Sequence, residues 1–289
     1  MKGALVDNLL VVGMGLMGGS ILKAAWEAGV AKRRLGLDRD PQTVKKALAM
    51  GIIHQGGYMP QSLPPGRTLV ILATHLDAFR EKMEELLPYL NPETVVTDVG
   101  SVKAPVVKDL TPLLATNGIP FVGSHPIAGT EKSGVENSIK DLFIGTRVII
   151  TPTSETPPEP INLVNNFWQA LGARVEEMEP QRHDVVFAAV SHLPHAVTYA
   201  LVKTMGDSER ELGDLLRFSG GGFKDFTRIA ASNPHMWREI FRLNKDHVLA
   251  FLRRFHVTMK ELENLMEEEK WEELEDILEE AQWLRRGLD

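Results

Sequence analysis

The sequence predicts an α/β protein in two parts, with a doubly wound, mostly parallel sheet at residues 1–180 and an all-helical domain at residues 181–289. Short apolar runs alternate with stretches of helical periodicity as far as residue 178, as expected for a parallel sheet covered by helices. A glycine-rich turn near the N-terminus lies between the first such strand and helix. From Pro180 onward no convincing strand follows, and helical periodicity continues to the end of the chain.

The first element is an apolar strand over residues 9–12, which leads directly into the glycine-rich sequence VVGMGLMGGS. Gly13, Gly15 and Gly18 match the dinucleotide-binding fingerprint G-x-G-x-x-G of Rossmann domains. The first glycine permits a tight turn, the second lets the backbone approach a pyrophosphate, and the third lets the helix pack close to the strand. The helix that begins here offers free N–H groups to phosphates. Within this turn, Leu16 and Met17 are also candidate cofactor-binding residues.

A second strand over residues 33–38 ends in Asp38, about 20 residues after the last motif glycine, where a carboxylate binds the adenosine ribose hydroxyls. This spacing favours NAD over NADP. The neighbouring Arg39 weakens the preference, because an arginine here accepts a 2′-phosphate. The alternative interpretation is an ordinary strand–helix turn with a surface aspartate.

The remaining elements of the first domain follow in order. Asp40 and Pro41 are typical N-cap and first-turn residues of a helix over residues 41–50, and the Gly/Pro-rich residues 54–65 are expected to form a loop. The apolar run 68–73 is typical of a central parallel strand, and Thr74 directly after it is a candidate cofactor contact. Strands are then expected at 94–98, 119–123, 147–151 and 174–178, and helices at 75–87, 102–114 and 161–171.

Composition narrows the functional classes. The chain has 289 residues, of which 43% are hydrophobic and 25% charged, as in ordinary globular proteins. Its net charge of −7 argues against a nucleic-acid partner, and the absence of cysteine excludes disulfides and thiolate metal sites. We see no signal peptide and no apolar run long enough to span a membrane, so we expect a cytoplasmic protein with no membrane partner.

Two stretches that follow strands carry candidate catalytic residues. Ser101 comes after the strand 94–98, where it either hydrogen-bonds a substrate hydroxyl or caps the next helix. His125 is expected in a Gly/Pro-flanked loop after the strand 119–123. A histidine at the ligand-binding edge of the sheet has the right ordinary pKa to deprotonate an alcohol, whereas a lone loop histidine is usually only solvated.

The helical domain is expected to contain helices at residues 183–205, 209–218, 225–231 and from 234 onward. His192 and His195 share a helical face, but no carboxylate pattern accompanies them, so we expect no metal site. Lys224 and Arg228 are candidate carboxylate ligands, with surface salt bridging as the alternative. Trp237, taken alone, is more often a core residue than part of a ligand site.

An apolar stripe marks the long C-terminal helical segment. Its members recur at spacings of three and four: Val248, Leu252, Phe255, Met259, Leu262 and Met266. Such a stripe packs either within its own domain or against a second copy of the chain, and the pattern does not distinguish the two.

Five stretches together resemble the prephenate dehydrogenase family, which also includes the arogenate dehydrogenases. They are GMGLMGGS at 13–20, DVGSVK at 98–103, GSHPIAGTEKSG at 123–134, SHLPHA at 191–196 and GGGFKDFTRIA from Gly220. The third and fifth are long and specific, and the resemblance extends over essentially the whole chain. It implies a Rossmann domain followed by an all-α dimerisation domain, and NAD-dependent oxidative decarboxylation of prephenate to 4-hydroxyphenylpyruvate and CO2.

The resemblance also implies roles for individual residues. His125 resembles the catalytic histidine that takes the proton of the ring hydroxyl, and Ser101 the serine that hydrogen-bonds the same region. His195 and Arg228 resemble residues that contact the substrate, the arginine through a carboxylate. The remaining substrate-site candidates are Thr130, Glu131, Trp237 and Lys224. No additional fused domain is expected, so tyrosine, if it inhibits, is expected to compete at the active site.

Three other functions remain open at this point. The nearest is arogenate dehydrogenase, which differs only in the side chain of the substrate. A two-domain NAD(P)-dependent hydroxyacid dehydrogenase is further away, because such enzymes usually carry a catalytic lysine in the helical domain. A dinucleotide-binding sensor without catalysis is disfavoured by the combination of His125, Ser101 and Arg228.

Overall fold

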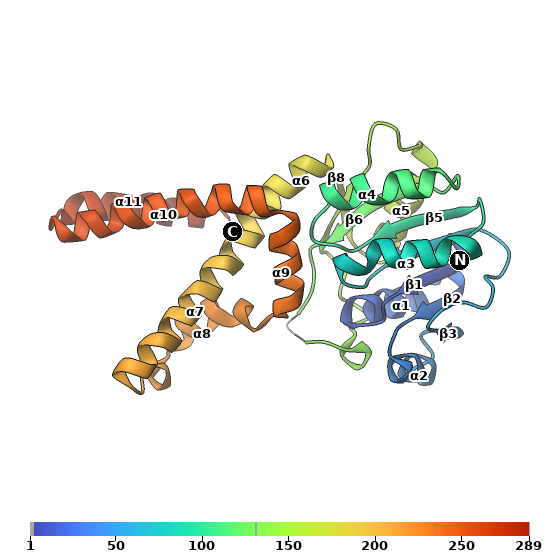
Figure 1. Cartoon of the computed structure of the whole chain (residues 1–289), viewed down its shortest axis with the longest axis horizontal. Helices are drawn as coiled ribbons and strands as arrows, with labels where there is room; N and C mark the ends of the chain where they lie inside the picture. The colour runs from blue at the N-terminus through green and yellow to red at the C-terminus, as the bar shows by residue number, and fades with distance from the viewer. Residues whose placement is uncertain (1–2, 131, 289) are drawn as a thin grey trace.

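The computed structural model describes residues 3–130 and 132–288. Figure 1 shows a sheet flanked by helices, which carries the N-terminus, and a separate group of helices formed by the C-terminal part of the chain. Helix α6 (Pro180–Phe187) leads from the first part to the second. The predicted fold class, a Rossmann-type domain followed by an all-α domain, is confirmed.

The sheet has eight strands in the order β3-β2-β1-β4-β5-β6-β7-β8. The strand order reverses between β1 and β4, and parallel pairing from β3 across to β6 brings the carboxyl ends of these strands to one edge. Ligands of open α/β sheets bind at this edge, beside the reversal. The bounds are β1 Val6–Val12, β2 Ala31–Leu37, β3 Gln55–Gly57, β4 Thr68–Leu72, β5 Thr94–Asp98, β6 Phe121–Pro126, β7 Arg147–Thr151 and β8 Arg174–Glu177.

Side-chain alternation along β1 explains why its sequence is apolar throughout. Leu9 and Val11 belong to a hydrophobic cluster on one face of the sheet, and Leu10 and Val12 to a second cluster on the other face. The first cluster includes residues of α1 (Leu16–Ala28), α2 (Pro41–Ala49) and α5 (Pro158–Ala170). The second includes residues of α3 (Phe79–Leu86) and α4 (Ala104–Ala115).

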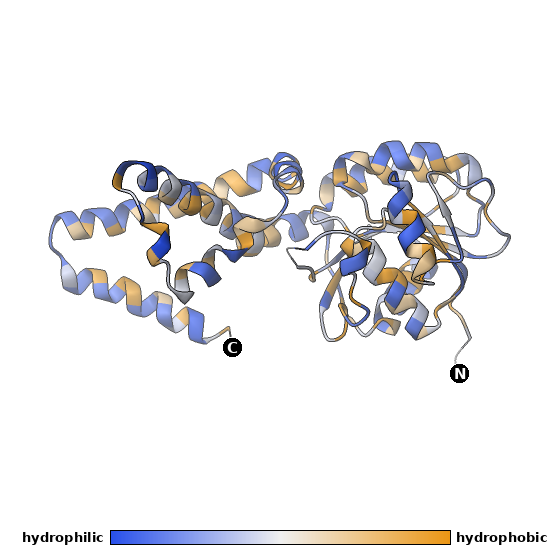
Figure 2. Ribbon diagram, turned by 90° about the horizontal axis from the view of Figure 1, so that it is seen from below, coloured by the Kyte–Doolittle hydropathy of each residue, from blue (hydrophilic) through white to orange (hydrophobic). Residues whose placement is uncertain are grey.

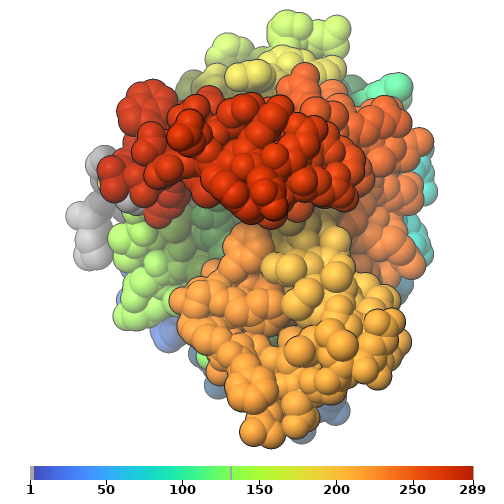
Figure 3. Space-filling model, turned by 90° about the vertical axis from the view of Figure 1, so that its left-hand side faces the viewer, coloured from blue at the N-terminus to red at the C-terminus, as the bar shows by residue number. Residues whose placement is uncertain are grey.

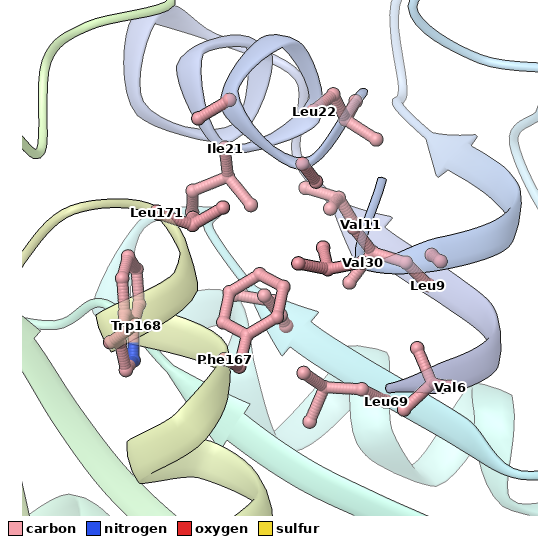
Figure 4. Packing of buried hydrophobic residues seen from close by; sticks show 14 of the residues in the cluster. Val6, Leu9, Val11, Ile21, Leu22, Val30, Leu69, Phe167, Trp168 and Leu171 are labelled. Carbon is pink, nitrogen blue, oxygen red and sulfur yellow. The ribbon is translucent and has the colours of Figure 1, made fainter. Parts of the chain in front are cut away.

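Figure 4 shows the first cluster from close by, with Phe167 and Trp168 of α5 packed towards Ile21 of α1 and Leu69 of β4. The rings of Phe167 and Trp168 meet edge-on, with centroids 5.4 Å apart. Both side chains are completely buried, and burial of such a ring contributes roughly 1.5–3 kcal/mol. This packing fixes the two helices on the sheet whose edge carries the site.

Two predictions for the first domain were wrong. The segment 54–65, predicted as a loop, contains the short strand β3, which adds a parallel edge to β2. The strand predicted at 119–123 is β6, which extends to Pro126, so His125 lies in a strand and not in a loop. The physical reason is the partner: β6 pairs with β5 only at Phe121 and Val122, but its antiparallel pairing with β7 continues to Pro126.

The helical domain begins with α6, the π-helical turn η4 (Ala188–His192) and α7 (Leu193–Leu212). The helix predicted at 209–218 is wrong, because α7 ends where Gly213 adopts φ 68°, a left-handed conformation that stops a helix. The later elements are η5 Leu216–Phe218, α8 Gly221–Thr227, η6 Arg228–Ala231, α9 Pro234–Leu243, α10 Lys245–Glu267 and α11 Trp271–Arg286.

The helices of this domain form two arms. Helices α10 and α11 lie side by side, and α7 with α8 diverges from them (Figure 1). Figure 3 shows the two arms end-on with a recess between them. Orange and blue segments alternate along the helices in Figure 2, and large apolar side chains such as Leu212, Phe218, Val257 and Trp283 are at least 70% exposed.

One helical run corrects the expectation that no apolar stretch is long enough to span a membrane. Pro180–Leu212 has the required length and composition, and 22% of its most apolar window is buried within the chain. The same run carries His183, Asp184 and His192, all of them buried. Buried polar groups of this kind are costly in a bilayer, and one such helix is weak support for a membrane span.

The two domains contact each other beside the carboxyl edge of the sheet. Val102, which follows β5, packs with Trp237 and Ile240 of α9 in a small hydrophobic cluster. Leu76 of the turn η1 (Leu76–Ala78) packs against the same cluster. The loops after β4 and β5 are therefore held against the helical domain.

Candidate active site

The glycine turn has the geometry that a bound dinucleotide requires. Gly13 has φ 91°, and a Cβ at this residue would lie 2.7 Å from the carbonyl oxygen of Ala73. A Cβ at Gly18 would lie 2.0 Å from the carbonyl oxygen of Gly13, so α1 can approach β1 only without a side chain here. Gly15 is the N-cap of α1, has no side-chain cap and has open space around it. The first N–H groups of α1 are thus available to a pyrophosphate.

The other predicted cofactor residues surround this turn. Asp38 follows β2 directly, and its carboxylate accepts hydrogen bonds from the backbone N–H groups of Met14, at 2.8 Å, and Asp40, at 3.0 Å. Arg39 is exposed, and Thr74 follows β4 with its hydroxyl bonded to the carbonyl of His75. Leu16 and Met17 lie half-buried in the first turn of α1. The structure brings these residues to the strand reversal, where they fit a nicotinamide dinucleotide.

His125 lies buried at the same edge and is joined to the helical domain. Its Nδ1 lies 2.9 Å from Nε2 of His183, and Nδ1 of His183 lies 2.8 Å from Oδ1 of Asp184. The ring of Phe187 packs against His125 with centroids 4.8 Å apart. The sequence analysis missed His183 and Asp184, because nothing in their spacing from His125 indicates that α6 folds back onto β6.

Asp184 also holds the segment that carries Ser101. Its two carboxylate oxygens accept hydrogen bonds from the N–H groups of Lys103, at 2.8 Å, and Ala104, at 2.9 Å. The N-cap of α4 is Lys103, which supplies no side-chain cap. The alternative interpretation of Ser101 as a helix cap is therefore wrong: a carboxylate from the other domain caps α4, and the Ser101 hydroxyl makes no hydrogen bond among the described residues.

A buried ion pair lies beneath this site. Lys103 and Asp98 are completely buried and paired, and Lys103 Nζ also donates to the carbonyl of Ser124, 2.9 Å away. A second Asp98 oxygen accepts from the N–H of Ser124 at 3.1 Å. These bonds tie the end of β5 to β6 one residue before His125.

The electrostatics keep His125 neutral. Burial lowers its pKa well below the usual 6.5, and nearby His183, Lys103 and His192 lower it further because they disfavour a second positive charge. A neutral imidazole is the protonation state that a general base needs. His125 is therefore ready to accept a proton at neutral pH.

His192 and His195 take separate positions and do not form a metal pair. Nδ1 of His192 lies 3.1 Å from Asn244 Nδ2, and the backbone of Ser101 lies close enough to the ring to raise its pKa against the larger lowering by burial. His195 stacks on Trp237 with centroids 3.7 Å apart, and its Nδ1 lies 2.9 Å from the carbonyl of Ser191. Trp237 is thus both a core residue and the support for His195.

The remaining predicted substrate residues are more peripheral. Arg228 is an exposed residue of η6, and Thr130 is exposed in the segment after β6. Lys224 of α8 lines a groove of about 400 Å3 beside Val202 and Phe223, and no contact recorded among the described residues joins it to His125. Glu131 lies outside the described residues.

One group of side chains has metal-like spacing. The ligand atoms of Asp77, His235 and Glu239 lie within 4.8 Å of one another. The Glu239 carboxylate, however, is paired with Arg238 at 2.9 Å and Arg242 at 2.7 Å. Two guanidinium groups already balance its charge, so we assign no metal to this group.

The fold and the glycine turn together are those of a two-domain, dinucleotide-dependent dehydrogenase. Family models agree. Residues 22–177 match the nucleotide-binding domain of prephenate dehydrogenase, and residues 179–280 match its dimerization domain. The chain belongs to the prephenate dehydrogenase family.

Individual relatives support this assignment. Prephenate dehydrogenase of Bacillus subtilis is 36% identical over 90% of this chain and 69% of its own length. Cyclohexadienyl dehydrogenase of Zymomonas mobilis is 32% identical over 88% of this chain and 87% of its own length.

Solved structures are similar over nearly the whole chain. Prephenate dehydrogenase from Aquifex aeolicus, in complex with hydroxyphenyl propionate and NAD+, has a TM-score of 0.89 and 42% identity, and the match covers 98% of both chains. Arogenate dehydrogenase from Synechocystis has a TM-score of 0.80 and 27% identity, with 98% of this chain and 100% of that chain covered.

Proposed function

We propose that this chain catalyses the NAD-dependent oxidative decarboxylation of prephenate to 4-hydroxyphenylpyruvate and CO2. The observation that carries the proposal is a buried, neutral histidine, His125, at the edge of the sheet that also holds the dinucleotide turn. The Aquifex relative supports it, because that protein binds NAD+ together with a ligand that has a phenol ring and a carboxylate side chain.

The cofactor in this proposal is NAD. The open backbone of Gly15 and the uncapped start of α1 suit the pyrophosphate, and the Asp38 carboxylate suits the ribose hydroxyls. When bound, NAD supplies a nicotinamide ring that can accept the hydride from the carbon that carries the substrate hydroxyl.

His125 acts as the base. Its Nε2 accepts the proton of the ring hydroxyl as the C–O bond becomes a carbonyl, and Ser101 donates a hydrogen bond to the same oxygen. The carboxylate across the ring then leaves as CO2, its bonding electrons complete the aromatic ring, and the former hydroxyl oxygen takes a proton back. Aromatisation drives this second step, so the protein contributes orientation and charge complementarity.

We assign the substrate's negative charges to the helical domain. Arg228 is proposed to bind a carboxylate, with Lys224 as a further cation, and His195 on Trp237 to contact the substrate. Thr130 and Glu131 complete the proposed substrate residues. This role for Arg228 follows from its motif, GGGFKDFTRIA, and from the need of a dianion for cationic partners.

The test is an NADH absorbance assay with prephenate and arogenate, each combined with NAD and NADP. We expect prephenate-dependent reduction of the nicotinamide to be much faster with NAD than with NADP. An enzyme that forms NADH only with arogenate would reassign the substrate. That second candidate is supported by the likeness to the Synechocystis arogenate dehydrogenase and to a cyclohexadienyl dehydrogenase.

We also propose that residues 181–289 form the dimerisation unit and that the chain is a homodimer. The matched dimerization-domain model and the exposed apolar side chains of α7, α10 and α11 support this. Met259 and Met266 of the predicted stripe are about half exposed, as expected if a partner covers them. Sedimentation velocity at micromolar concentration tests it: a monomer would contradict the proposal.

Two further proposals concern inhibition by tyrosine and the location of the protein in the cell. We propose that tyrosine, which shares the phenol ring and carboxylate of the product, competes with prephenate at this site, and inhibition that leaves the KM for prephenate unchanged would contradict this. We propose a cytoplasmic location, in keeping with the match to prephenate dehydrogenases. Fractionation of cells that express the tagged full chain tests the location.

A further inference from the structure

We propose that His183 and Asp184 are positioning residues that set which ring nitrogen of His125 carries the proton. This inference rests on the proposed role of His125. It is drawn from a continuous chain of contacts: His125 Nδ1 to His183 Nε2 at 2.9 Å, then His183 Nδ1 to Asp184 Oδ1 at 2.8 Å. All three residues are buried, so water does not compete with these bonds.

The direction of the protons follows from Asp184. An ionised carboxylate only accepts hydrogen bonds, so Nδ1 of His183 is the protonated nitrogen. In a neutral imidazole the other nitrogen then has a lone pair, and Nε2 of His183 accepts from Nδ1–H of His125. Nε2 of His125 is left with its lone pair, which is the form that takes a proton from a hydroxyl.

The ionised state of Asp184 has its own support. The same carboxylate accepts the N–H groups of Lys103 and Ala104 at the start of α4, where the helix dipole favours a negative charge. Lys103, whose ammonium is paired with Asp98, lies close enough to interact with Asp184. These contacts favour the ionised carboxylate of Asp184 over the protonated acid.

The arrangement couples the base to the position of the domains. β6 and the start of α4 belong to the sheet domain, whereas His183 and Asp184 belong to α6. One carboxylate therefore orders both the His125 tautomer and the loop of Ser101. His125 is surrounded by His183, Lys103, His192 and Phe187. Of these four residues, only His183 offers an acceptor to Nδ1 of His125.

Asp184→Asn removes the charge and half of the acceptor capacity of this side chain. Oδ1 of Asp184 accepts from His183 Nδ1–H and from the N–H of Lys103, and Oδ2 accepts from the N–H of Ala104, so an amide N–H₂ in either place faces a donor. In Ser-His-Asp hydrolases the corresponding change lowers kcat about 10⁴-fold, and we expect a loss of at least about 100-fold here. Glu179→Gln is the matched control, because Glu179 is exposed and its side chain accepts from the N–H of Arg182, not from the His183 ring. We expect its kcat to stay within about twofold of wild type.

A second pair of variants leaves Asp184 and its bonds to α4 intact. His183→Gln keeps an oxygen that accepts from His125 Nδ1–H, whereas His183→Leu fills similar space without an acceptor. We expect the Leu variant to lose kcat by at least about 100-fold and the Gln variant to retain at least about tenfold more activity than Leu. Equal kcat values for Gln and Leu, or a Leu variant with wild-type kcat, would overturn the proposal.

The nitrogen of His125 that carries the proton is a readout that a purely structural role of His183 and Asp184 would not change. Long-range ¹H–¹⁵N spectra of the histidine-labelled enzyme, assigned with His125→Asn, report which nitrogen is protonated. Wild type is expected to show His125 protonated at Nδ1, and His183→Leu, which offers Nδ1 no acceptor, is expected to show a larger share protonated at Nε2. A wild-type His125 protonated at Nε2 would overturn the inference. This spectrum needs no substrate, so it stays decisive even if wild type fails to oxidise prephenate, which would refute the proposed function alone.

Discussion

At the scale of single residues, the chemistry depends on His125 being buried and neutral. A solvated histidine of ordinary pKa would be partly protonated near pH 6.5, and a protonated imidazole accepts nothing. Burial, together with the nearby positive charge of Lys103, removes this competition. The proposed proton transfer is assigned to this ring alone, so the residue is expected to be sensitive to substitution.

Replacing His125 with Asn removes the base and keeps a polar side chain of similar width. We expect kcat to fall by about 100-fold or more, the usual contribution of a general base, with little change in the KM for prephenate. NADH absorbance at saturating NAD measures both constants. His54→Asn, at an exposed histidine earlier in the chain, is the control. A wild-type kcat in His125→Asn would refute the assignment of His125 as the base.

The kcat/KM of the wild-type enzyme is expected to depend weakly on pH near neutrality. The folded pKa of His125 lies well below 6.5, so its base form persists as the pH falls from 7.5 to 6.5. Measurement of kcat/KM across this pH range tests whether the dependence is weak. A decline that follows an ordinary histidine titration would indicate a solvated base.

Replacing Arg228 with Ala tests the carboxylate clamp. A hydrogen bond to a charged group contributes about 1.5–3 kcal/mol, so we expect the KM for prephenate to rise about tenfold or more while the KM for NAD stays the same. Arg174→Ala, at an exposed arginine of β8, is the control. An effect confined to NAD would contradict the clamp.

At the scale of elements, the glycine turn separates folding from cofactor binding. Gly18 touches the backbone of Gly13, so its missing side chain is needed for α1 to pack on β1. A Cβ at Gly15 would instead point into open space, with no packed atom within 4 Å, so its missing side chain matters only to something that binds there. The two glycines of one motif are therefore required for different reasons, one for the packing of α1 and the other for cofactor binding.

Alanine substitutions distinguish these reasons. We expect Gly18→Ala to lower the Tm of the protein without cofactor, because two backbone segments must separate to admit the Cβ. We expect Gly15→Ala to leave that Tm nearly unchanged and to raise the dissociation constant for NAD. Thermal unfolding and titration with NAD measure the two effects. A large fall in Tm for Gly15→Ala would show that this glycine is structural.

At the scale of the whole molecule, the domain contact is built from groups that resist protonation. The pKa values of His125, His183, His192 and His195 are all lowered by burial, that of His192 to about 4. In the unfolded chain each of these histidines titrates near 6.5. The contact between the domains therefore contributes stability that depends on pH.

The sign of this dependence is fixed by linkage. Below pH 6.5 the unfolded state binds protons that the folded state does not, so stability is fully present above this pH and falls as the pH drops towards 4. Each such histidine contributes a slope of at most about 1.4 kcal/mol per pH unit. Urea unfolding between pH 7 and 5 measures it, and His192→Gln is expected to show a shallower slope. A stability that rises towards pH 5 would contradict the burial of these groups.

Several parts of the protein depend only on local sequence patterns and were predicted from them. The alternation of strands and helices, the glycine turn and Asp38 follow from short-range rules of sterics and periodicity, and the fold class was predicted correctly. The family resemblance came from long local motifs around His125 and Gly220. The positions of Arg228, Lys224 and Glu131 relative to His125 stay predictions of that resemblance.

The contacts between these parts depend on long-range packing, which the structure reveals. His125 lies in a strand because β7 pairs with β6 beyond the end of β5, and Ser101 is no cap because a carboxylate from another domain takes that place. His183 and Asp184 reach the site through the return of α6 to the sheet edge. Such contacts join residues far apart in the chain, and no local pattern encodes which of them will be buried together.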